Sequence, residues 1–275
     1  CFPILQAALI SAVMAENGTP EQLQRWLPPI AAGDAIVALA LTEPRHGTDA
    51  ANIELHAEET ADGWRLSGEK TSIMVASHAT HALVFARTSG PGARGITAFY
   101  VAMNDPGIQV TPHRDLGCRA GGRGHITFDR VHVDPSDLVS APGNGFGAIL
   151  KGFAVSRAWI ALMALAVGQV CIDEALTHVA AREAFGQPLS RYQAVTFPLV
   201  EHTTLLHAAR TLALEALWCA DHDRDPRVPT NMAKWWAPKV AADAAQQALL
   251  AFGHLGWNED GPIAQRLRDV LGLQL

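Results

Sequence analysis

The residues best suited to chemistry lie in one short polar loop that follows an apolar run. The loop, Leu41–Asp49, reads LTEPRHGTD. Pro44 has no N–H and Gly47 tolerates a positive φ, so the other backbone donors of the loop can converge on a bound group. The hydroxyls of Thr42 and Thr48 add two polar contacts. Such a loop suits a flat heterocycle with amide-like edges or a phosphate, although an ordinary strand-to-turn transition uses the same residue types.

The pattern Thr-Glu-Pro-x-x-Gly-Thr-Asp after an apolar strand resembles a signature of the acyl-CoA dehydrogenase family. In that family the loop holds the flavin of FAD against a fatty acyl thioester. The resemblance implies that Leu41, Thr42 and Thr48 bind FAD and that Thr48 also contacts the acyl-CoA substrate. Further segments match the family in the same order, so the resemblance covers nearly the whole chain.

A second stretch, Arg182–Pro188 with Gln193 shortly after it, has the form Arg-x-x-Phe-Gly-x-Pro followed by Gln. By residue type alone it is the cationic end of a helix with a Gly/Pro stop. It is also similar to the family's second signature, in which the arginine and the glutamine contact the FAD of a neighbouring subunit. A planar, permanently charged guanidinium suits a diphosphate. The resemblance assigns Arg182, Phe185 and Gln193 to the cofactor and implies a homodimer or homotetramer.

Two more segments match the family. Arg157 lies one turn into an apolar helix, where the family has an arginine beside the acyl-CoA channel; a side chain that reaches the surface is the alternative. The loop GHLGW, with Gly253 and Gly256, resembles the family's Gly-Gly-x-Gly-aromatic loop at the neighbour's FAD. It departs from the family at His254, where a glycine is usual, and at Leu250, where glutamine is common.

The largest departure from the family follows Lys70. The family usually reads Lys-x-Trp-Ile-Thr-Asn there, with the tryptophan over the flavin and the threonine at its N5 edge. In this chain Ser72 stands for the tryptophan and Met74 for the threonine. Backbone groups of both residues still suit the flavin, so we assign them to the cofactor site, and the substrate class and the reaction stay open.

The family's reaction is the α,β-desaturation of an acyl-CoA thioester, in which a carboxylate takes an α proton and FAD takes the β hydride. The base is usually a glutamate shortly after an Arg-Asp pair, and counting from Asp269 places it just beyond Leu275. In other members it precedes the arginine that matches Arg157, where this chain has Ser156. The resemblance therefore places no catalytic residue in the chain, which looks truncated at both ends.

Two functions fit these residues. The first is an FAD-dependent acyl-CoA or acyl-carrier dehydrogenase, which by the resemblance passes electrons to an electron-accepting flavoprotein. The second is a non-desaturating flavoprotein of the same fold, either a flavin oxidase or a protein that binds FAD and acyl-CoA without the base. A Glu-Gly-Thr sequence after Leu275 favours the first function, and its absence favours the second.

Composition and residue spacing indicate which classes of ligand the chain binds and in which compartment it functions. A net charge of −6 without a basic block argues against nucleic acid, so an acidic CoA needs locally placed arginine. The four cysteines form no CxxC, which favours a reducing cytoplasm. The apolar stretch Ala158–Ile172 is too short for a membrane span and contains a glutamine, so we expect a buried helix. The pairs His78/His81 and His202/His207 lack a third ligand at zinc-like spacing, and we predict no metal site.

The hydrophobic period changes twice and predicts a multidomain α and β protein. The resemblance implies that it has an acyl-CoA dehydrogenase-like fold. Residues 1–34 are expected to be the remnant of an N-terminal helical domain, 35–144 a central antiparallel β-barrel, and 145–275 a C-terminal antiparallel four-helix bundle. The expected strands are Ala35–Leu41, Ile53–Glu59, Gly63–Ser67, Ala82–Arg87, Ile96–Val101, Ile108–Pro112 and His125–Val133. The expected bundle helices are Phe146–Phe153, Ser156–Phe185, Ser190–Asp221 and Pro229–Phe252.

Short sequence patterns predict where one helix begins and ends and where one hairpin turns. Thr19 and Gln22 predict a capping box at the start of a helix that ends near Trp26, because Pro28-Pro29 follows. Asp62-Gly63 predicts a hairpin turn.

The bundle sequence also predicts self-association. Its Ala-rich helices, Ala158–Ala181 and Ala237–Ala251, permit close helix approach. Trp218, Trp235 and Trp236 provide large apolar anchors for an interface, with the core of a single subunit as the alternative place for them.

Overall fold

The computed structural model describes residues 2–275, and Cys1, with which the N-terminal helix was predicted to begin, lies outside the described residues. The chain forms two compact units. The strand unit comprises the described chain up to Asp115 together with Arg119–Phe153, and the helical unit comprises Leu116–Cys118 and Ala154–Leu275. The N-terminal helices therefore lie in the same compact unit as the strands, and the predicted domain boundaries after residues 34 and 144 stay a prediction.

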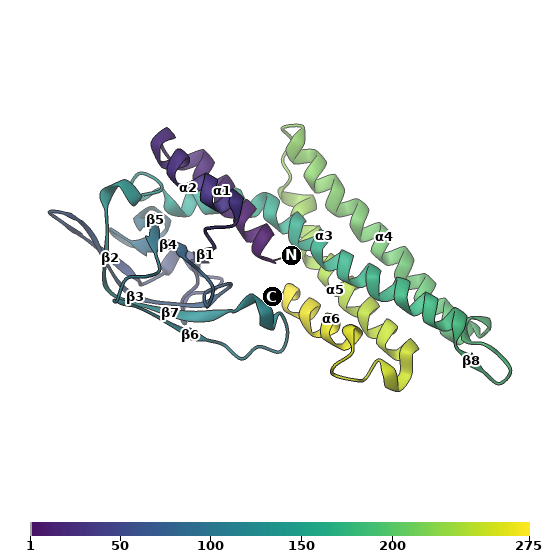
Figure 1. Cartoon of the computed structure of the whole chain (residues 1–275). Helices are drawn as coiled ribbons and strands as arrows, with labels where there is room; N and C mark the ends of the chain where they lie inside the picture. Colours follow the sequence, from purple (N-terminus) through teal and green to yellow (C-terminus); the bar gives the residue numbers. More distant parts are fainter. Residues whose placement is uncertain (1) are drawn as a thin grey trace. The chain divides into compact units, whose positions relative to one another are not determined.

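Seven strands of the strand unit form one curled sheet (Figure 1). Neighbours follow the order β1–β4–β2–β3–β7–β6, and β5 pairs with β4. The strands are β1 (Val37–Ala40), β2 (His56–Thr60), β3 (Gly63–Ile73), β4 (His81–Arg87), β5 (Ile96–Ala102), β6 (Ile108–Pro112) and β7 (Gly124–Val133). The β2–β3 hairpin turns at Asp62-Gly63, with Thr60 opposite Gly63, as predicted.

The prediction of an antiparallel barrel needs correction, because the sheet is mixed. β1 runs parallel to β4, from Val37 opposite His81 to Ala40 opposite Val84. Parallel neighbours need a long connection, and the β2–β3 hairpin lies within the chain that connects them. Among the strands that the structure describes, the pairing also does not return from β6 to β1, so the sheet is open.

The paired strands β4 and β5 are buried on both faces. Every residue from Ala82 to Ala86 is completely buried. On one face Phe99 packs against Trp64, with ring centroids 5.6 Å apart. On the other face Tyr100 packs against Trp26, with centroids 5.0 Å apart. Because both faces of β4 are buried, its sequence is continuously apolar and does not alternate between apolar and polar residues.

The helices α1 (Phe2–Asn17) and α2 (Pro20–Ala32) precede the sheet. The predicted capping box is confirmed: Thr19 Oγ1 accepts from the Gln22 N–H, and Gln22 Oε1 accepts from the Thr19 N–H at 2.8 Å. The predicted end near Trp26 is wrong, because α2 continues through both prolines to a left-handed Gly33. Trp26 and Ile30 lie one turn apart and are both buried, so packing on the sheet outweighs the lost backbone donors.

The helical unit contains α3 (Gly145–Ala181) from Ala154 onward, α4 (Gln193–Asp221), α5 (Arg227–Phe252) and α6 (Pro262–Leu271). Figure 1 shows α3, α4 and α5 as long neighbouring helices. At Gly168 of α3, a Cβ would lie 2.9 Å from the Leu206 side chain of α4 and 3.0 Å from the Ala241 Cα of α5. The small residue therefore lets three helices approach closely.

The predicted four helices need correction at both ends of the unit. The segments Phe146–Phe153 and Ser156–Phe185 are not separate helices, because α3 is continuous between them and ends at Ala181. The fourth helix is α6, whose amphipathic pattern the sequence analysis did not use. Between α3 and α4 lies a short hairpin of β8 (Glu183–Ala184) and β9 (Gln187–Pro188).

Short 3₁₀ turns connect the remaining elements; they are Ala50–Asn52, Ala93–Gly95, Arg119–Gly121, Pro135–Asp137, Leu189–Arg191, Gly253–Leu255 and Gly272–Gln274. Within residues 2–275, α3 alone is long and apolar enough to cross a membrane by length and composition. This is weak evidence for a span, because the core helix of a globular protein passes the same test.

Candidate functional site

The loop Leu41–Asp49 leaves the end of β1 at the sheet and is fixed at its inner end. Leu41 is buried, Thr42 is half-buried and Thr48 is exposed. The Thr42 carbonyl accepts a backbone hydrogen bond of 2.9 Å from Thr71 of β3. Glu43 and His46 exchange two backbone hydrogen bonds of 3.1 Å, which close a tight turn. The inner residues therefore have defined positions, and Thr48 lies farther out on the surface.

The segment that carries Ser72 and Met74 lies beside the inner end of this loop. Ser72 follows Thr71, whose N–H bonds to Thr42, so the structure brings Leu41, Thr42 and Ser72 together near the ends of β1 and β3. The ladder between β3 and β7 shifts register between Lys70 and Ile73, which marks a bulge. β3 continues to Ile73, well beyond the predicted end at Ser67, because Gly68, Glu69 and Lys70 also pair with β7.

The backbone of this segment is strained. Ser72 and Val75 both have φ of 59°, a left-handed conformation that side chains other than glycine rarely adopt. For Val75 the cost is larger, because its side chain is β-branched. Met74 lies between them and is half-buried. Conformations of this kind cost about 1–3 kcal/mol each and concentrate at binding sites.

Two residues that the sequence analysis did not single out hold the loop from beneath. Lys70 is fully buried, and its Nζ lies 2.8 Å from Oε1 of the buried Glu43 and 2.9 Å from the Leu41 carbonyl oxygen. The sequence contains a signal for this pair, because side chains at every second position of a strand face the same side and Lys70 lies four positions after the apolar Leu66. A lysine at an inward position requires a buried acceptor.

The hairpin after α3 presents the predicted cofactor residues of the helical unit. Arg182 follows the last residue of α3 and is exposed, and its carbonyl accepts a 2.8 Å bond from the Leu189 N–H. Phe185 and Gly186 form the tip with φ of 51° and 79°. This turn type requires positive φ, which ends the helix earlier than the predicted Phe185. The Phe185 side chain is 97% exposed.

Gln193 begins α4 beside this hairpin. The neighbouring Tyr192 hydroxyl donates a 2.8 Å hydrogen bond to the Ala184 carbonyl oxygen. The structure therefore brings Arg182, Phe185 and Gln193 to the same end of the helical unit, and all three are exposed.

The loop after α5 lies at that end as well. The Phe252 ring at the end of α5 stacks on His178 in the last turn of α3, with centroids 4.2 Å apart. Gly253 follows with φ of 60°. Gly256 is buried against α5, where a Cβ would lie only 2.3 Å from the Leu249 carbonyl oxygen. The departure at His254 is an exposed side chain, so it leaves this backbone path intact.

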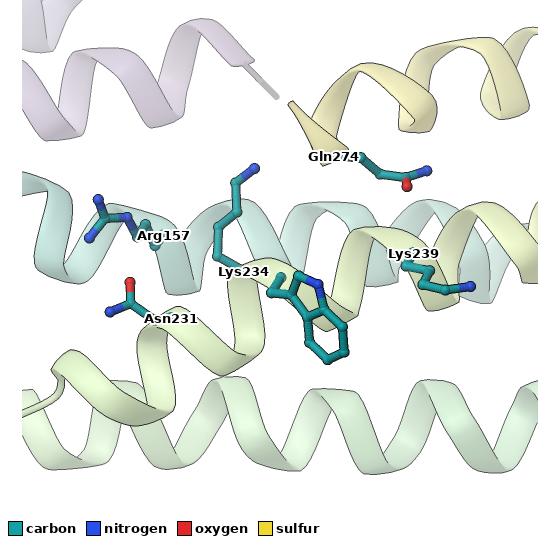
Figure 2. Close-up of a pocket in the computed structure, with 6 residues that line it drawn as sticks. Arg157, Asn231, Lys234, Lys239 and Gln274 are labelled. Atoms are coloured by element: carbon teal, nitrogen blue, oxygen red, sulfur yellow. The ribbon is translucent and has the colours of Figure 1, made fainter. Parts of the chain in front are cut away.

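Arg157 lines a pocket of the helical unit with a volume of about 380 Å³. Figure 2 shows Arg157 on α3 and Asn231, Lys234 and Lys239 on α5. The complete lining is Arg157, Asn231, Lys234, Trp235, Lys239 and Gln274. The described lining thus contains three cations and no carboxylate, and it favours an anionic ligand.

Lys234 connects this pocket to the last residues of the chain. Its Nζ donates to the carbonyl oxygens of Leu273 and Leu275, at 3.0 and 2.5 Å. Burial and the nearby Arg157 guanidinium lower the pKa of Lys234. Lys239 differs, because it pairs with Asp243 at 3.0 Å.

The tryptophans proposed as interface anchors are not core residues of the helical unit. Trp235 is 74% exposed and Trp218 is 45% exposed. Trp236 is half-buried. The exposed Trp218 ring packs against His222 and Arg224 of the same chain.

Comparison with known proteins agrees with these features. Residues 38–131 match the description "Acyl-CoA dehydrogenase, middle domain", and residues 143–275 match "Acyl-CoA dehydrogenase, C-terminal domain". The short-chain specific acyl-CoA dehydrogenase of Bos taurus mitochondria is 34% identical over 92% of this chain and 62% of the relative. A 3-(aryl)acrylate reductase from Clostridium sporogenes is 32% identical over 92% of this chain and 68% of the relative.

A solved structure shows the same fold. The butyryl-CoA dehydrogenase from Megasphaera elsdenii superposes with a TM-score of 0.92 and 29% identity, over 97% of this chain and 70% of that chain. This chain therefore spans only about two thirds of the length of these relatives. With two matched domains in the family's order and a relative more than 30% identical over two thirds of its length, the chain belongs to the acyl-CoA dehydrogenase family.

Proposed function

We propose that this chain is the FAD-binding and acyl-CoA-binding part of an enzyme that desaturates an acyl thioester between its α and β carbons. The observation that carries the proposal is the contact between the loop Leu41–Asp49 and the strained segment Ser72–Val75, joined by the Thr71–Thr42 hydrogen bond of 2.9 Å. Members of the family hold a flavin between these two segments; this chain keeps the first, and in the second it has Ser72 and Met74 in place of the usual tryptophan and threonine.

The residues present fit FAD. The strained backbone at Ser72 and Val75 is of the kind found where a chain turns its polar groups toward a ligand. Arg182 and Gln193 are exposed donors for a diphosphate, and the exposed Phe185 ring offers a face for a flat heterocycle. Bound FAD would supply the hydride acceptor that amino-acid side chains lack.

The chain's own groups have separate tasks in this proposal. Leu41 and Thr42 orient the flavin, and Thr48 meets the acyl thioester. Arg182, Phe185 and Gln193, with the loop at Gly253 and Gly256, serve the FAD of a neighbouring subunit. These residues lie at one end of the helical unit, which supports a shared role.

The cationic pocket supplies the local positive charge that an acidic CoA needs. Arg157 and Lys234 line it, while the chain as a whole carries a net charge of −6. The attraction is therefore confined to the pocket and not spread over the surface. We assign the proton-transfer step to no residue of the chain.

Assembly and electron transfer complete the proposal. The exposed Phe185 and Trp235 support a homo-oligomer, a dimer or a tetramer, because large apolar side chains at the surface favour association. An electron-accepting flavoprotein would reoxidise the cofactor, and a cytoplasmic location is proposed from the cysteine pattern alone.

A second candidate is a flavoprotein of this fold that does not desaturate acyl-CoA. Two observations favour it. Ser72 and Met74 replace the tryptophan and threonine that the family usually has at the flavin. The relative named 3-(aryl)acrylate reductase shares 32% identity, and its name indicates reduction of a double bond.

Anaerobic titration of the purified protein with saturated acyl-CoA of several lengths tests the proposal. Bleaching of the visible flavin band, with formation of the enoyl thioester, is the expected result. Retention of FAD without bleaching by any acyl-CoA, in a protein that extends to the predicted Glu-Gly-Thr, supports the second candidate. A protein that binds no FAD at all overturns both.

A further inference from the structure

The strand unit contains a lysine that is completely enclosed by protein. Lys70 lies on β3 and has one of the largest side chains that are fully buried in the described residues. Its Nζ contacts Glu43 Oε1 at 2.8 Å and the Leu41 carbonyl oxygen at 2.9 Å. Glu43 is 4% exposed, so neither member of this ion pair faces water.

The Glu43 carboxylate joins three separate segments of the chain. Oε1 accepts from Lys70 of β3 and from the Leu55 N–H at 2.9 Å. Oε2 accepts from the Glu54 N–H at 2.5 Å. The Leu41–Asp49 loop is thereby connected to β3 and to the chain just before β2, through charge-assisted hydrogen bonds that are short and directional.

Stability alone does not account for this arrangement. Removing two charges from water is costly, and a well-packed apolar pair of similar volume is often as stable or more stable. What an ion pair adds is a fixed geometry, because its hydrogen bonds are satisfied in one position of the two segments only. The position that Glu43 and Lys70 fix is that of the loop relative to β3.

The pair lies directly next to the residues proposed to hold the flavin. Glu43 follows Thr42 in the chain, and Lys70 itself bonds to the Leu41 carbonyl oxygen. Thr71, the next residue after Lys70, donates its N–H to Thr42, and Ser72 follows it. The ion pair and the Thr71–Thr42 bond therefore hold both sides of the proposed cofactor site at the same place.

We propose that Glu43 and Lys70 are positioning residues that hold the Leu41–Asp49 loop and the Ser72–Val75 segment at the spacing the flavin requires. This inference rests on the proposed function. Neither side chain contacts the flavin in this view, because both are enclosed beneath the loop. Loss of the pair loosens the loop in the empty protein and weakens cofactor binding, while the sheet stays folded.

The burial of Lys70 agrees with a positioning role. Burial lowers the pKa of Lys70 to about 8, and the charge and hydrogen bond of Glu43 act against that shift. Burial and the Glu43 carboxylate therefore act on the pKa of Lys70 in opposite directions, and the ammonium form of Lys70 depends on its carboxylate partner.

The test uses the double variant Glu43→Gln with Lys70→Met. The double change removes both charges together, which avoids leaving one buried charge unpaired, and the carboxamide keeps an acceptor for the Glu54 or Leu55 N–H. The control is Val131→Ala, a cavity in the core of the same sheet, opposite Leu66 and away from the loop. It lowers stability without touching the ion pair.

Two readouts are measured on each protein. The first is hydrogen exchange of the Thr71 amide in the FAD-free protein, compared with the amides of β4 and β5. The second is the Kd for FAD by flavin fluorescence. In the double variant we expect Thr71 to exchange about tenfold faster or more, unchanged protection in β4 and β5, and a Kd for FAD about tenfold higher or more. The control should change neither Thr71 relative to the sheet nor the Kd.

The outcomes separate this inference from the proposed function. If the unaltered protein binds FAD and the double variant binds it equally well, the positioning role is wrong and the proposed cofactor stands. If the unaltered protein binds no FAD, the proposed function fails, and faster Thr71 exchange still reports on the loop. If all amides of the sheet lose protection together, the pair serves folding in general and the inference is wrong.

Discussion

The substitution Gly256→Ala is predicted to destabilise the protein, because the structure has no room for a methyl group at this position. Its φ of −69° and ψ of −25° suit any residue, so Gly256→Ala brings no backbone strain of its own. The new Cβ, however, would lie 2.3 Å from the Leu249 carbonyl oxygen and 3.0 Å from the Leu249 carbonyl carbon. Both are backbone atoms of the helix α5, which a rotamer change cannot move aside.

The expected size of the effect follows from that geometry. The loop after α5 must move outward by enough to restore an ordinary contact, and overpacking of this kind costs about 1–3 kcal/mol. The matched control is Gly272→Ala, because Gly272 has φ of −63° and ψ of −20° and a Cβ there meets nothing within 4 Å. We expect the control to be neutral or to stabilise by about 0.4–1 kcal/mol.

Urea unfolding followed by far-ultraviolet circular dichroism measures both variants, with helix loss reporting on the helical unit. FAD retention after gel filtration is measured on the same samples, since the displaced loop carries Gly253. Equal midpoints for Gly256→Ala and Gly272→Ala would refute the reasoning, because the two positions have similar φ and ψ but differ in the space available to a methyl group.

Three further predictions concern charged groups. Arg182→Ala should weaken FAD binding by about 1.5–3 kcal/mol, which is the range for a hydrogen bond to a charged group. A variant that purifies with its full flavin complement contradicts this prediction, and so does an unaltered monomer that still holds FAD in sedimentation. The pKa of Lys70 is about 8 in the folded protein and 10.5 ordinarily, so between these values the unfolded chain binds more protons than the folded protein. The free energy of unfolding of the unaltered protein, minus that of Lys70→Met, should therefore rise with pH over this range, by at most about 3 kcal/mol. Over the same range FAD affinity should fall, because neutral Lys70 loses its charge-assisted bond to Glu43; a stability difference that falls with pH contradicts the assignment. Arg157→Ala should raise KM for acyl-CoA more than it lowers kcat, with a weaker salt dependence, and an unchanged KM excludes the pocket as the CoA site.

Features decided within one turn of chain were predictable from the sequence. The capping box of Thr19 and Gln22 needs only two residues three positions apart, and the structure has both of its hydrogen bonds. The hairpin at Asp62-Gly63 likewise depends on its own turn chemistry. The strand Ile108–Pro112 has the predicted ends, because Pro106-Gly107 precedes it and the ladder to β7 ends at Pro112.

Features decided by distant partners were not predictable. Pro28 and Pro29 stop a helix by local rules, but burial of Trp26 and Ile30 keeps α2 helical to its glycine cap. Alternation along β3 indicates that Lys70 faces inward, yet its partner Glu43 is 27 residues away in sequence. The parallel pairing of β1 with β4 depends in the same way on the whole sheet, and no pattern within either strand encodes it.

The positive φ angles of Ser72, Val75 and Phe185 have a consequence for engineering this protein. Glycine at the exposed Ser72 or Phe185 would relieve the strain, whereas glycine at the buried Val75 would also leave a cavity. A library selected only for heat resistance should therefore accumulate glycine at Ser72 and Phe185. Each gain would be made at a segment proposed to contact the cofactor, where a freer backbone must be ordered again on binding. Variants chosen by melting temperature alone would then be more stable and bind flavin less tightly, so Ser72 and Phe185 are the positions to keep fixed in such a library.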